Sequence, residues 1–143
     1  MFRQIAGSVF ASPQIDLAEV EQAKALGVTL IINNRPEDES PDQVPGPAIE
    51  AAARAAGIDY VAIPVTHAGF SAPQVEAMAA ALAGAGGPVL AYCRSGTRST
   101  LLWALAEAST GADPEVLTEA AAGAGYDLGP IRSLLDVLSA RAG

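Results

Sequence analysis

The sequence has 143 residues, of which 50% are hydrophobic and 17% are charged, and its 16 acidic and 8 basic side chains give a formal net charge of −8. This length and composition predict one domain over 1–143 with its own core, and the negative charge argues against partners such as nucleic acid or anionic membranes. One cysteine and one histidine exclude a disulfide framework and a Cys/His zinc site. Since no apolar run is long enough to span a bilayer or resembles a signal peptide, we expect a soluble, cytoplasmic domain.

Short β-rich runs alternate with Ala-rich helical patterns along the chain. In order, the pattern predicts a strand at 8–11, a helix at 17–26, a strand at 28–32, a helix at 47–56, a strand at 60–65, a helix from Ser71 to about 84, a strand at 88–92, and helices at 98–110, 114–122 and 128–140. Strands that alternate with helices need crossover connections. The sequence therefore predicts a single α/β domain, with a mainly parallel central sheet of about four strands flanked by helices.

Three predicted loops follow directly after strands, at 33–45, 66–71 and 93–98. Parallel sheets bind ligands beyond the carboxyl ends of their strands, so these three loops are expected to line a site. The only cysteine of the chain, Cys93, begins the third loop. A candidate nucleophile therefore lies where this fold class places its ligands.

The segment Cys93-Arg94-Ser95-Gly96-Thr97-Arg98-Ser99 lies between a buried strand and the first turn of a helix. Backbone N–H groups of such a turn converge on one point, and the helix N-terminus adds partial positive charge, so the loop is predicted to bind an anion. Gly96 permits the positive φ that such a turn uses. Arg94 and Arg98 flank the thiol and favour its nucleophilic thiolate form. The pattern thus favours covalent catalysis by Cys93 over a small buried side chain at a strand end.

The Cys-x-x-Gly-x-Arg-Ser pattern resembles the active-site loops of rhodanese-type sulfurtransferases and of cysteine-dependent protein phosphatases. The whole chain resembles the bacterial beta-lactamase hydrolase-like family, also called DUF442. The matching stretches are Phe2-Arg3-Gln4-Ile5, Ser12-Pro13-Gln14, Ile31-Ile32-Asn33-Asn34-Arg35-Pro36, Ile63-Pro64-Val65 and the segment from Ala91 to Ser99. The resemblance implies a fold similar to dual-specificity phosphatases. Members of the family are named both as phosphatases and as sulfur transferases.

Two departures from the phosphatase pattern favour sulfur transfer. Phosphatases of this architecture place five residues between the cysteine and the arginine, usually after a histidine; here four residues separate Cys93 from Arg98, and Tyr92 replaces the histidine. A phosphoryl group needs a wide ring of amides and a bidentate arginine, whereas a persulfide presents one sulfur. Related phosphatases also carry an acidic Asp in the loop before the cysteine, and residues 66–70 contain no carboxylate.

The sequence therefore predicts a sulfurtransferase, similar to rhodanese, that moves sulfane sulfur through a Cys93 persulfide. Its donor would be thiosulfate or another persulfide, and its acceptor a thiol. The alternative is a phosphatase of the protein tyrosine or dual-specificity type, which hydrolyses a phosphate ester through a Cys93 phosphocysteine. Cys93 and Arg98 are essential in both mechanisms, and neither requires a cofactor or a metal. A non-catalytic anion-binding or redox-sensing module is a further alternative, although the chain has no second cysteine to resolve a sulfenic acid.

The other candidate residues bind the anion or supply a proton. The predicted substrate-binding residues are Arg94, Ser95, Gly96, Thr97, Ser99 and Arg35. In a phosphatase, Arg98 would clamp the phosphoryl oxygens and Ser99 would stabilise the leaving thiolate. His67 and Asp38 are the candidate acids, with Glu37 as a further option. The acidic run from Glu37 to Glu39 is otherwise interpreted as a solvated loop.

Overall fold

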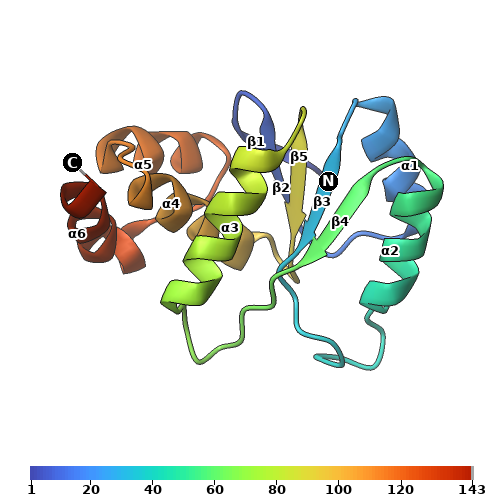
Figure 1. The fold of residues 1–143 in the computed structure, drawn as a ribbon. Coiled ribbons are helices and arrows are strands. Elements are labelled where there is room, and N and C mark those ends of the chain that lie inside the picture. The colour runs from blue at the N-terminus through green and yellow to red at the C-terminus, as the bar shows by residue number, and fades with distance from the viewer. Residues whose placement is uncertain (143) are drawn as a thin grey trace.

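A five-stranded sheet with the spatial order β1-β2-β5-β3-β4 forms the centre of residues 1–142, the part of the chain that this computed structural model describes (Figure 1). The strands are β1 (Arg3–Ala6), β2 (Val9–Ser12), β3 (Leu30–Asn33), β4 (Asp59–Ala62) and β5 (Val89–Tyr92). All neighbouring strands pair in parallel except β1, which runs antiparallel to β2. The predicted parallel α/β sheet is confirmed, with five strands rather than about four.

Strand β1 is the strand that the sequence pattern does not reveal. It lies at the edge of the sheet, and Ile5 is its one fully buried side chain. A turn at Gly7 and Ser8 returns the chain into β2. Because an edge strand pairs on one side only and buries few side chains, it lacks the continuous apolar run that marks the central strands.

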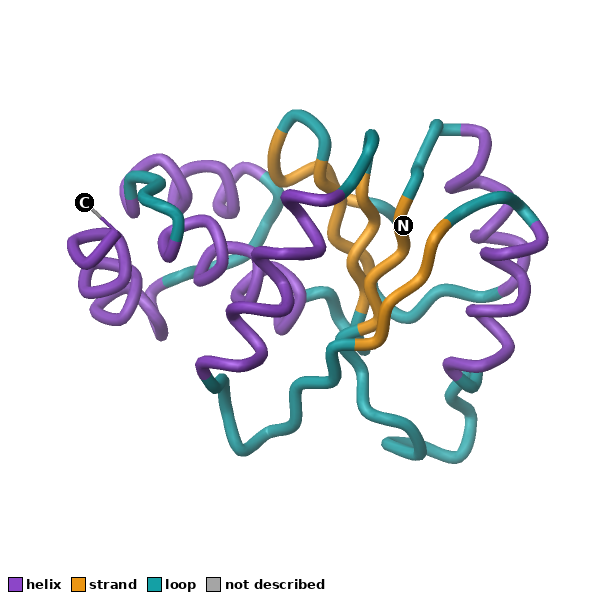
Figure 2. The backbone as a smooth tube through the Cα atoms, viewed as in Figure 1, coloured by secondary structure: helices purple, strands orange, loops and turns teal. Residues whose placement is uncertain are grey.

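Helices cover both faces of the sheet (Figures 1 and 2). On one face lie α1 (Leu17–Ala25) and α2 (Gly46–Ala55), and on the other lie α3 (Ala72–Gly84) and α4 (Thr97–Ser109). The C-terminal helices α5 (Pro114–Gly123) and α6 (Arg132–Ala142) pack against α4. The last predicted helix, at 128–140, differs at its start, because a short 3-10 turn at Gly129–Ile131 precedes α6.

Successive side chains of the central strands enter two different hydrophobic cores. In β5, Val89 and Ala91 lie in the core beneath α3 and α4, whereas Leu90 and Tyr92 lie in the core beneath α1 and α2. Burial on both faces explains why this strand reads as a continuous apolar run. The chain leaves the sheet at Cys93, whose side chain is itself buried.

Candidate active site

The cysteine loop is the turn that connects β5 to α4. Gly96 is the N-cap of α4 and has a φ of 92°, and its backbone N–H donates a hydrogen bond of 3.1 Å to the Cys93 sulfur. A Cβ atom at this glycine would overlap the hydroxyl of Tyr126. Both the backbone conformation and the available space therefore require glycine here, and an amide of the turn is directed at the sulfur, as the loop pattern predicts.

Tyr126 contacts this turn from the segment between α5 and α6. Its hydroxyl donates a hydrogen bond of 3.3 Å to the carbonyl of Ser95. The Arg3 guanidinium lies 5.3 Å from the centre of the tyrosine ring, and it also donates a 3.1 Å hydrogen bond to the carbonyl of Ala124. Residues from both ends of the chain thus support the cysteine loop, a connection that sequence spacing does not signal.

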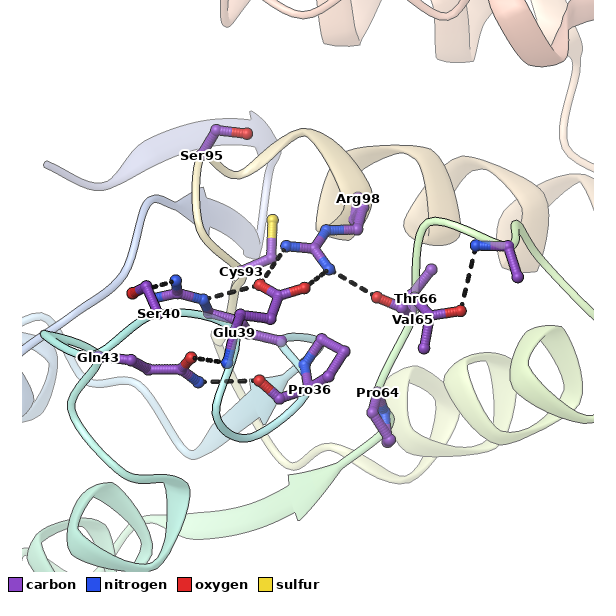
Figure 3. Close-up of polar contacts among 12 residues, drawn as sticks. Pro36, Glu39, Ser40, Gln43, Pro64, Val65, Thr66, Cys93, Ser95 and Arg98 are labelled. Atoms are coloured by element: carbon purple, nitrogen blue, oxygen red, sulfur yellow. Dashed lines mark hydrogen bonds and ion pairs between the residues drawn. The ribbon is translucent and has the colours of Figure 1, made fainter.

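Arg98 extends from the first turn of α4 toward Cys93 (Figure 3). Its Nη1 donates to the Val65 carbonyl at 2.7 Å and to Oε2 of Glu39 at 2.7 Å, and its Nη2 donates to Oε1 of Glu39 at 2.8 Å. Glu39 chiefly, with a further contribution from Cys93, raises the pKa of Arg98 above its ordinary value. The site therefore holds a fixed positive charge beside the sulfur.

Glu39 also receives a hydrogen bond from a second guanidinium. Nε of Arg35 donates to Oε1 of Glu39 at 2.9 Å, and the other two nitrogens of Arg35 donate to Gln14 at 2.9 Å and Ser40 at 3.1 Å. Hydrogen bonds from Arg98 first, and from Arg35 next, lower the pKa of Glu39 from its ordinary 4.5 to about 2 against the opposing effect of burial. This carboxylate is therefore ionised at neutral pH and has no proton to donate.

Hydrogen bonds within the loop between β3 and α2 hold Glu39 in this place (Figure 3). The Gln43 side chain accepts from the Glu39 backbone N–H at 2.9 Å and donates to the Pro36 carbonyl at 2.9 Å. The side chain of Asn33, the last residue of β3, accepts from the Arg35 backbone N–H at 2.9 Å. These hydrogen bonds give the loop a defined conformation. This explains how the acidic side chain of Glu39 is held beside an anion site.

The interpretation of the acidic run as a solvated loop is wrong for Glu39, whose side chain is only 16% exposed. Glu37 and Asp38 are exposed, as that interpretation expects, although the Glu37 carboxylate also accepts a hydrogen bond of 2.8 Å from the backbone N–H of Gly46. The sequence contains one signal for this difference: three acids directly follow a strand and its Arg35, at an edge of the sheet where an anion site is expected. A carboxylate there needs positive partners, and Arg35 and Arg98 provide them.

The remaining predicted anion ligands occupy different environments. Arg94, Ser95 and Thr97 are exposed, and the Ser95 hydroxyl donates to that of Thr97 at 3.1 Å. Ser99 is buried, and its hydroxyl has no hydrogen-bond partner within residues 1–142. The side chain of Arg35 is only 3% exposed. Because its nitrogens contact Glu39 and two neighbouring side chains, we assign it to the support of Glu39 rather than to substrate binding.

Neither candidate acid forms a hydrogen bond to the cysteine loop in the part of the chain that the structure describes. His67 and Asp38 are both exposed. His67 lies two residues beyond Val65, whose carbonyl binds Arg98, and Asp38 directly precedes Glu39. Their loops thus flank the site, while their roles as acids stay predictions.

Residues 1–110 match the sequence model of a family described as "Beta-lactamase hydrolase-like protein, phosphatase-like domain". The chain belongs to this family. A beta-lactamase hydrolase-like protein of Xylella fastidiosa is 40% identical over 104 residues, which are 72% of this chain and 24% of that relative. The chain therefore spans about a quarter of the length of this curated relative.

Solved structures of similar sequence share the fold over nearly the whole chain. A "putative phosphatase" from Neisseria meningitidis is 34% identical with a TM-score of 0.83, and the match covers 95% of this chain and 96% of that one. A "putative phosphatase (DUF442)" from Shewanella putrefaciens is 28% identical with a TM-score of 0.77, covering 99% and 93% of the two chains. The fold is thus phosphatase-like, which confirms the resemblance to the beta-lactamase hydrolase-like family and the fold class predicted from the sequence. The resemblance of the cysteine loop to rhodanese-type loops stays a prediction.

Two further observations concern residues 1–142. No helix in this range has both the length and the hydropathy needed to cross a membrane. In the same range, no cluster of three or more His, Cys, Asp or Glu side chains has the arrangement of a metal site.

Proposed function

We propose that this chain is a cysteine-dependent phosphatase that hydrolyses phosphate monoesters through a Cys93 phosphocysteine. One observation carries this function: in a member of a phosphatase-like family, the Gly96 amide and the Arg98 guanidinium are both directed to the Cys93 side chain. The preference for sulfur transfer drawn from the sequence is thereby reversed, because the family and the structures of similar sequence favour the alternative. The proposal concerns this domain alone, since the curated relatives are much longer.

The reaction has two displacement steps at phosphorus. The Cys93 thiolate attacks phosphorus, the bond from phosphorus to the ester oxygen breaks, and the leaving oxygen takes a proton from an acid. We favour His67 as this acid, with Asp38 as the second candidate, because related phosphatases carry their acid in the loop that corresponds to residues 66–70. The loops of both residues contact Arg98, one through the Val65 carbonyl and the other through Glu39. Water then attacks phosphorus and gives a proton to the deprotonated acid, the phosphorus–sulfur bond breaks to restore the Cys93 thiolate, and inorganic phosphate leaves. Arg98 and the amides of the turn stabilise the charge on the three non-bridging oxygens of the phosphoryl group as it is transferred.

A sulfurtransferase is the second candidate function, and one feature favours it. Only four residues separate Cys93 from Arg98, so the ring of amides is smaller than in phosphatases with five. In this mechanism, Cys93 attacks the outer sulfur of thiosulfate, the sulfur–sulfur bond of the donor breaks, and sulfite leaves. An acceptor thiolate then attacks the outer sulfur of the Cys93 persulfide and releases the Cys93 thiolate.

Hydrolysis of para-nitrophenyl phosphate tests the phosphatase. We expect nitrophenol release by the protein, none by Cys93→Ser, and a loss of about 100-fold or more in Arg98→Lys, since lysine cannot hold two oxygens in a fixed fork. Arg54→Lys is the matched control, because Arg54 is an exposed residue of α2 that pairs with Glu50 on the surface of the same helix. Release that persists in Cys93→Ser would contradict the proposed function.

A further inference from the structure

We propose that the substrate carries a second oxyanion, a carboxylate or another phosphate, on its leaving group, and that Arg94 binds this group at the mouth of the Cys93 site. The inference rests on the proposed function, because it names the class of phosphate monoester that the same site accepts. Arg94 directly follows the nucleophile in the chain, yet its side chain is exposed whereas that of Cys93 is buried. Arg94 therefore lies at the rim, beside the part of a bound ester that stays outside the loop.

The guanidinium of Arg94 has no hydrogen-bond acceptor among residues 1–142, the part of the chain that the structure describes. The other two arginines of the site are engaged, because Arg35 and Arg98 both bind the Glu39 carboxylate. The arginines elsewhere in the fold also bind acceptors in this range, with the exception of Arg141 near the C-terminus. A guanidinium carries five N–H donors, and those of Arg94 are all free to bind a ligand.

The backbone that carries this free side chain is held in place. The backbone N–H of Gln14 donates to the Arg94 carbonyl at 3.2 Å, and the N–H of Cys93 donates to the Ser12 carbonyl at 3.3 Å. A side chain on a fixed backbone loses less conformational entropy on binding than one on a mobile loop. Arg94 is therefore suited to recognise a group that lies at a defined distance from the phosphorus atom.

The charge of Arg94 acts on the side of the mouth formed by the loop between β3 and α2. A hydrogen bond from Ser40 chiefly lowers the pKa of Asp42 in that loop, and the charge of Arg94 contributes to the same shift. The Asp42 carboxylate accepts from Ser40 at 2.6 Å, and within residues 1–142 it forms no ion pair with Arg94. Arg94 is thus near this loop without being bound to it, so a ligand on that side meets a free guanidinium.

The phosphoryl group that is transferred has its own ligands and does not need Arg94. Arg98 and the amides of the turn surround the Cys93 sulfur, and the group of Arg98, Arg35 and Glu39 already carries one net positive charge. Arg94 adds a second positive charge at the mouth, in a chain whose formal net charge is −8. This local charge attracts a second negative group on the same substrate. A solvated surface arginine, by contrast, would not distinguish where on the substrate that group lies.

The ortho, meta and para isomers of carboxybenzylphosphonate separate a contact with Arg94 from a general attraction to its charge. The three isomers have the same charge and differ only in the position of the carboxylate, and benzylphosphonate is the reference with one oxyanion. The experiment measures how each compound protects Cys93, the only cysteine, from alkylation by iodoacetamide, with intact mass as the readout. Phosphonates have no ester bond to hydrolyse, so the assay gives a result even if the proposed phosphatase activity is absent. Failure of that activity is read separately, from nitrophenol release.

We expect the wild type to bind one isomer about fivefold or more tightly than the other two and than benzylphosphonate, which is the effect of one charge-assisted contact. Arg94→Gln should abolish this preference. Arg54→Gln is the matched control, because it removes one exposed arginine from the surface of α2, and it should keep the preference.

Circular dichroism establishes that each variant is folded. A wild type that binds the three isomers equally would overturn the role of Arg94, as would a folded Arg94→Gln variant that keeps the preference of the wild type. Equal weakening of all four compounds by Arg94→Gln would also overturn it, because Arg94 would then act on the phosphoryl group itself.

Discussion

The carboxylate of Glu39 accepts hydrogen bonds of 2.7 and 2.8 Å from two nitrogens of Arg98, a residue 59 positions further along the chain. The sheet explains how the two residues meet. Strands β3 and β5 are neighbours and run parallel, so the loop after β3 and the turn after β5 leave the sheet at the same edge. The strand order therefore brings these two segments together at the Cys93 site.

The ion pair of Glu39 predicts a pH-dependent contribution to stability. Its pKa is lowered from 4.5 to about 2 in the folded protein. A lowered pKa stabilises the fold above the unfolded value, and this stabilisation is lost as the pH falls toward the folded value. Glu39→Gln should therefore lose stability relative to the wild type at pH 7, with a pH-dependent part of at most about 3 kcal/mol that shrinks between about pH 4.5 and pH 2.

Urea unfolding at several pH values measures this difference. The matched control is Glu50→Gln, which removes an exposed ion pair with Arg54 on the surface of α2. We expect that variant to change the free energy of unfolding by less than about 1 kcal/mol. A difference between wild type and Glu39→Gln that stays constant from pH 7 to pH 3 would contradict the pairing of Glu39 with the two guanidiniums.

The turn at Gly96 predicts a second stability effect. Gly96 has a φ of 92°, and a Cβ there would overlap Tyr126. We expect Gly96→Ala to lower the free energy of unfolding by about 1–2 kcal/mol from the backbone alone, with a further loss from the overlap. Gly84→Ala is the control, because Gly84 is helical and its Cβ would meet no atom within 4 Å. Equal stability of the two variants in urea unfolding would contradict this account.

Removal of one hydroxyl tests the support of the cysteine loop by the C-terminal segment. Tyr126→Phe keeps the ring beneath Arg3 but removes the 3.3 Å hydrogen bond to the Ser95 carbonyl. We expect a loss of about 0.5–1.5 kcal/mol in thermal or urea unfolding, together with slower alkylation or turnover at Cys93. If both stability and reactivity equal those of the wild type, Tyr126 does not support the loop.

The candidate acid predicts a dependence on the leaving group. A poor leaving oxygen needs a proton, whereas para-nitrophenolate leaves without one. We therefore expect His67→Ala to lower kcat about 100-fold or more on phenyl phosphate, and far less on para-nitrophenyl phosphate. Asp38→Asn is the comparison variant from the other loop. If Asp38→Asn shows the larger selective loss, the acid is Asp38, and if neither variant does, both assignments fail.

The central strands and the cysteine loop could be predicted from the sequence because residues that are adjacent in the chain determine them. The run at 28–32 is apolar because β3 is covered on both faces, and the Ser71 cap of α3 is confirmed by a 2.8 Å hydrogen bond from its N–H to Gln74. The nucleophile and its turn follow from a strand, a glycine and a helix in direct succession. Strand β1 could not be predicted, because an edge strand buries too few side chains to produce a recognisable apolar pattern in the sequence.

The partners of Arg98 could not be predicted, because they depend on contacts between distant segments. Glu39 and Val65 come from two other loops, and only the sheet order places them beside α4. A run of three exposed acids and a run in which one acid is partly buried and paired have the same composition. In the structure, Glu39 differs from Glu37 and Asp38 because it pairs with the guanidiniums of Arg35 and Arg98. The local sequence does not connect these two arginines.

The length of the loop predicts how well the site accepts phosphate. Insertion of one glycine between Gly96 and Thr97 restores the five-residue spacing of phosphatases. We expect the insertion to raise kcat/KM for para-nitrophenyl phosphate, since a wider ring of amides suits the three oxygens of a phosphoryl group better. A folded insertion variant with unchanged phosphatase activity would show that loop length does not determine how well the site accepts phosphate.

Intact mass spectrometry after separate exposure to para-nitrophenyl phosphate and to thiosulfate tests the proposed phosphatase most directly. Our account predicts nitrophenol release and a trapped phosphoryl adduct on the protein, both absent in Cys93→Ser. It also predicts no stable gain of sulfur from thiosulfate. A gain of one sulfur atom that requires Cys93, without any release of nitrophenol, would contradict the account and identify a sulfur carrier instead.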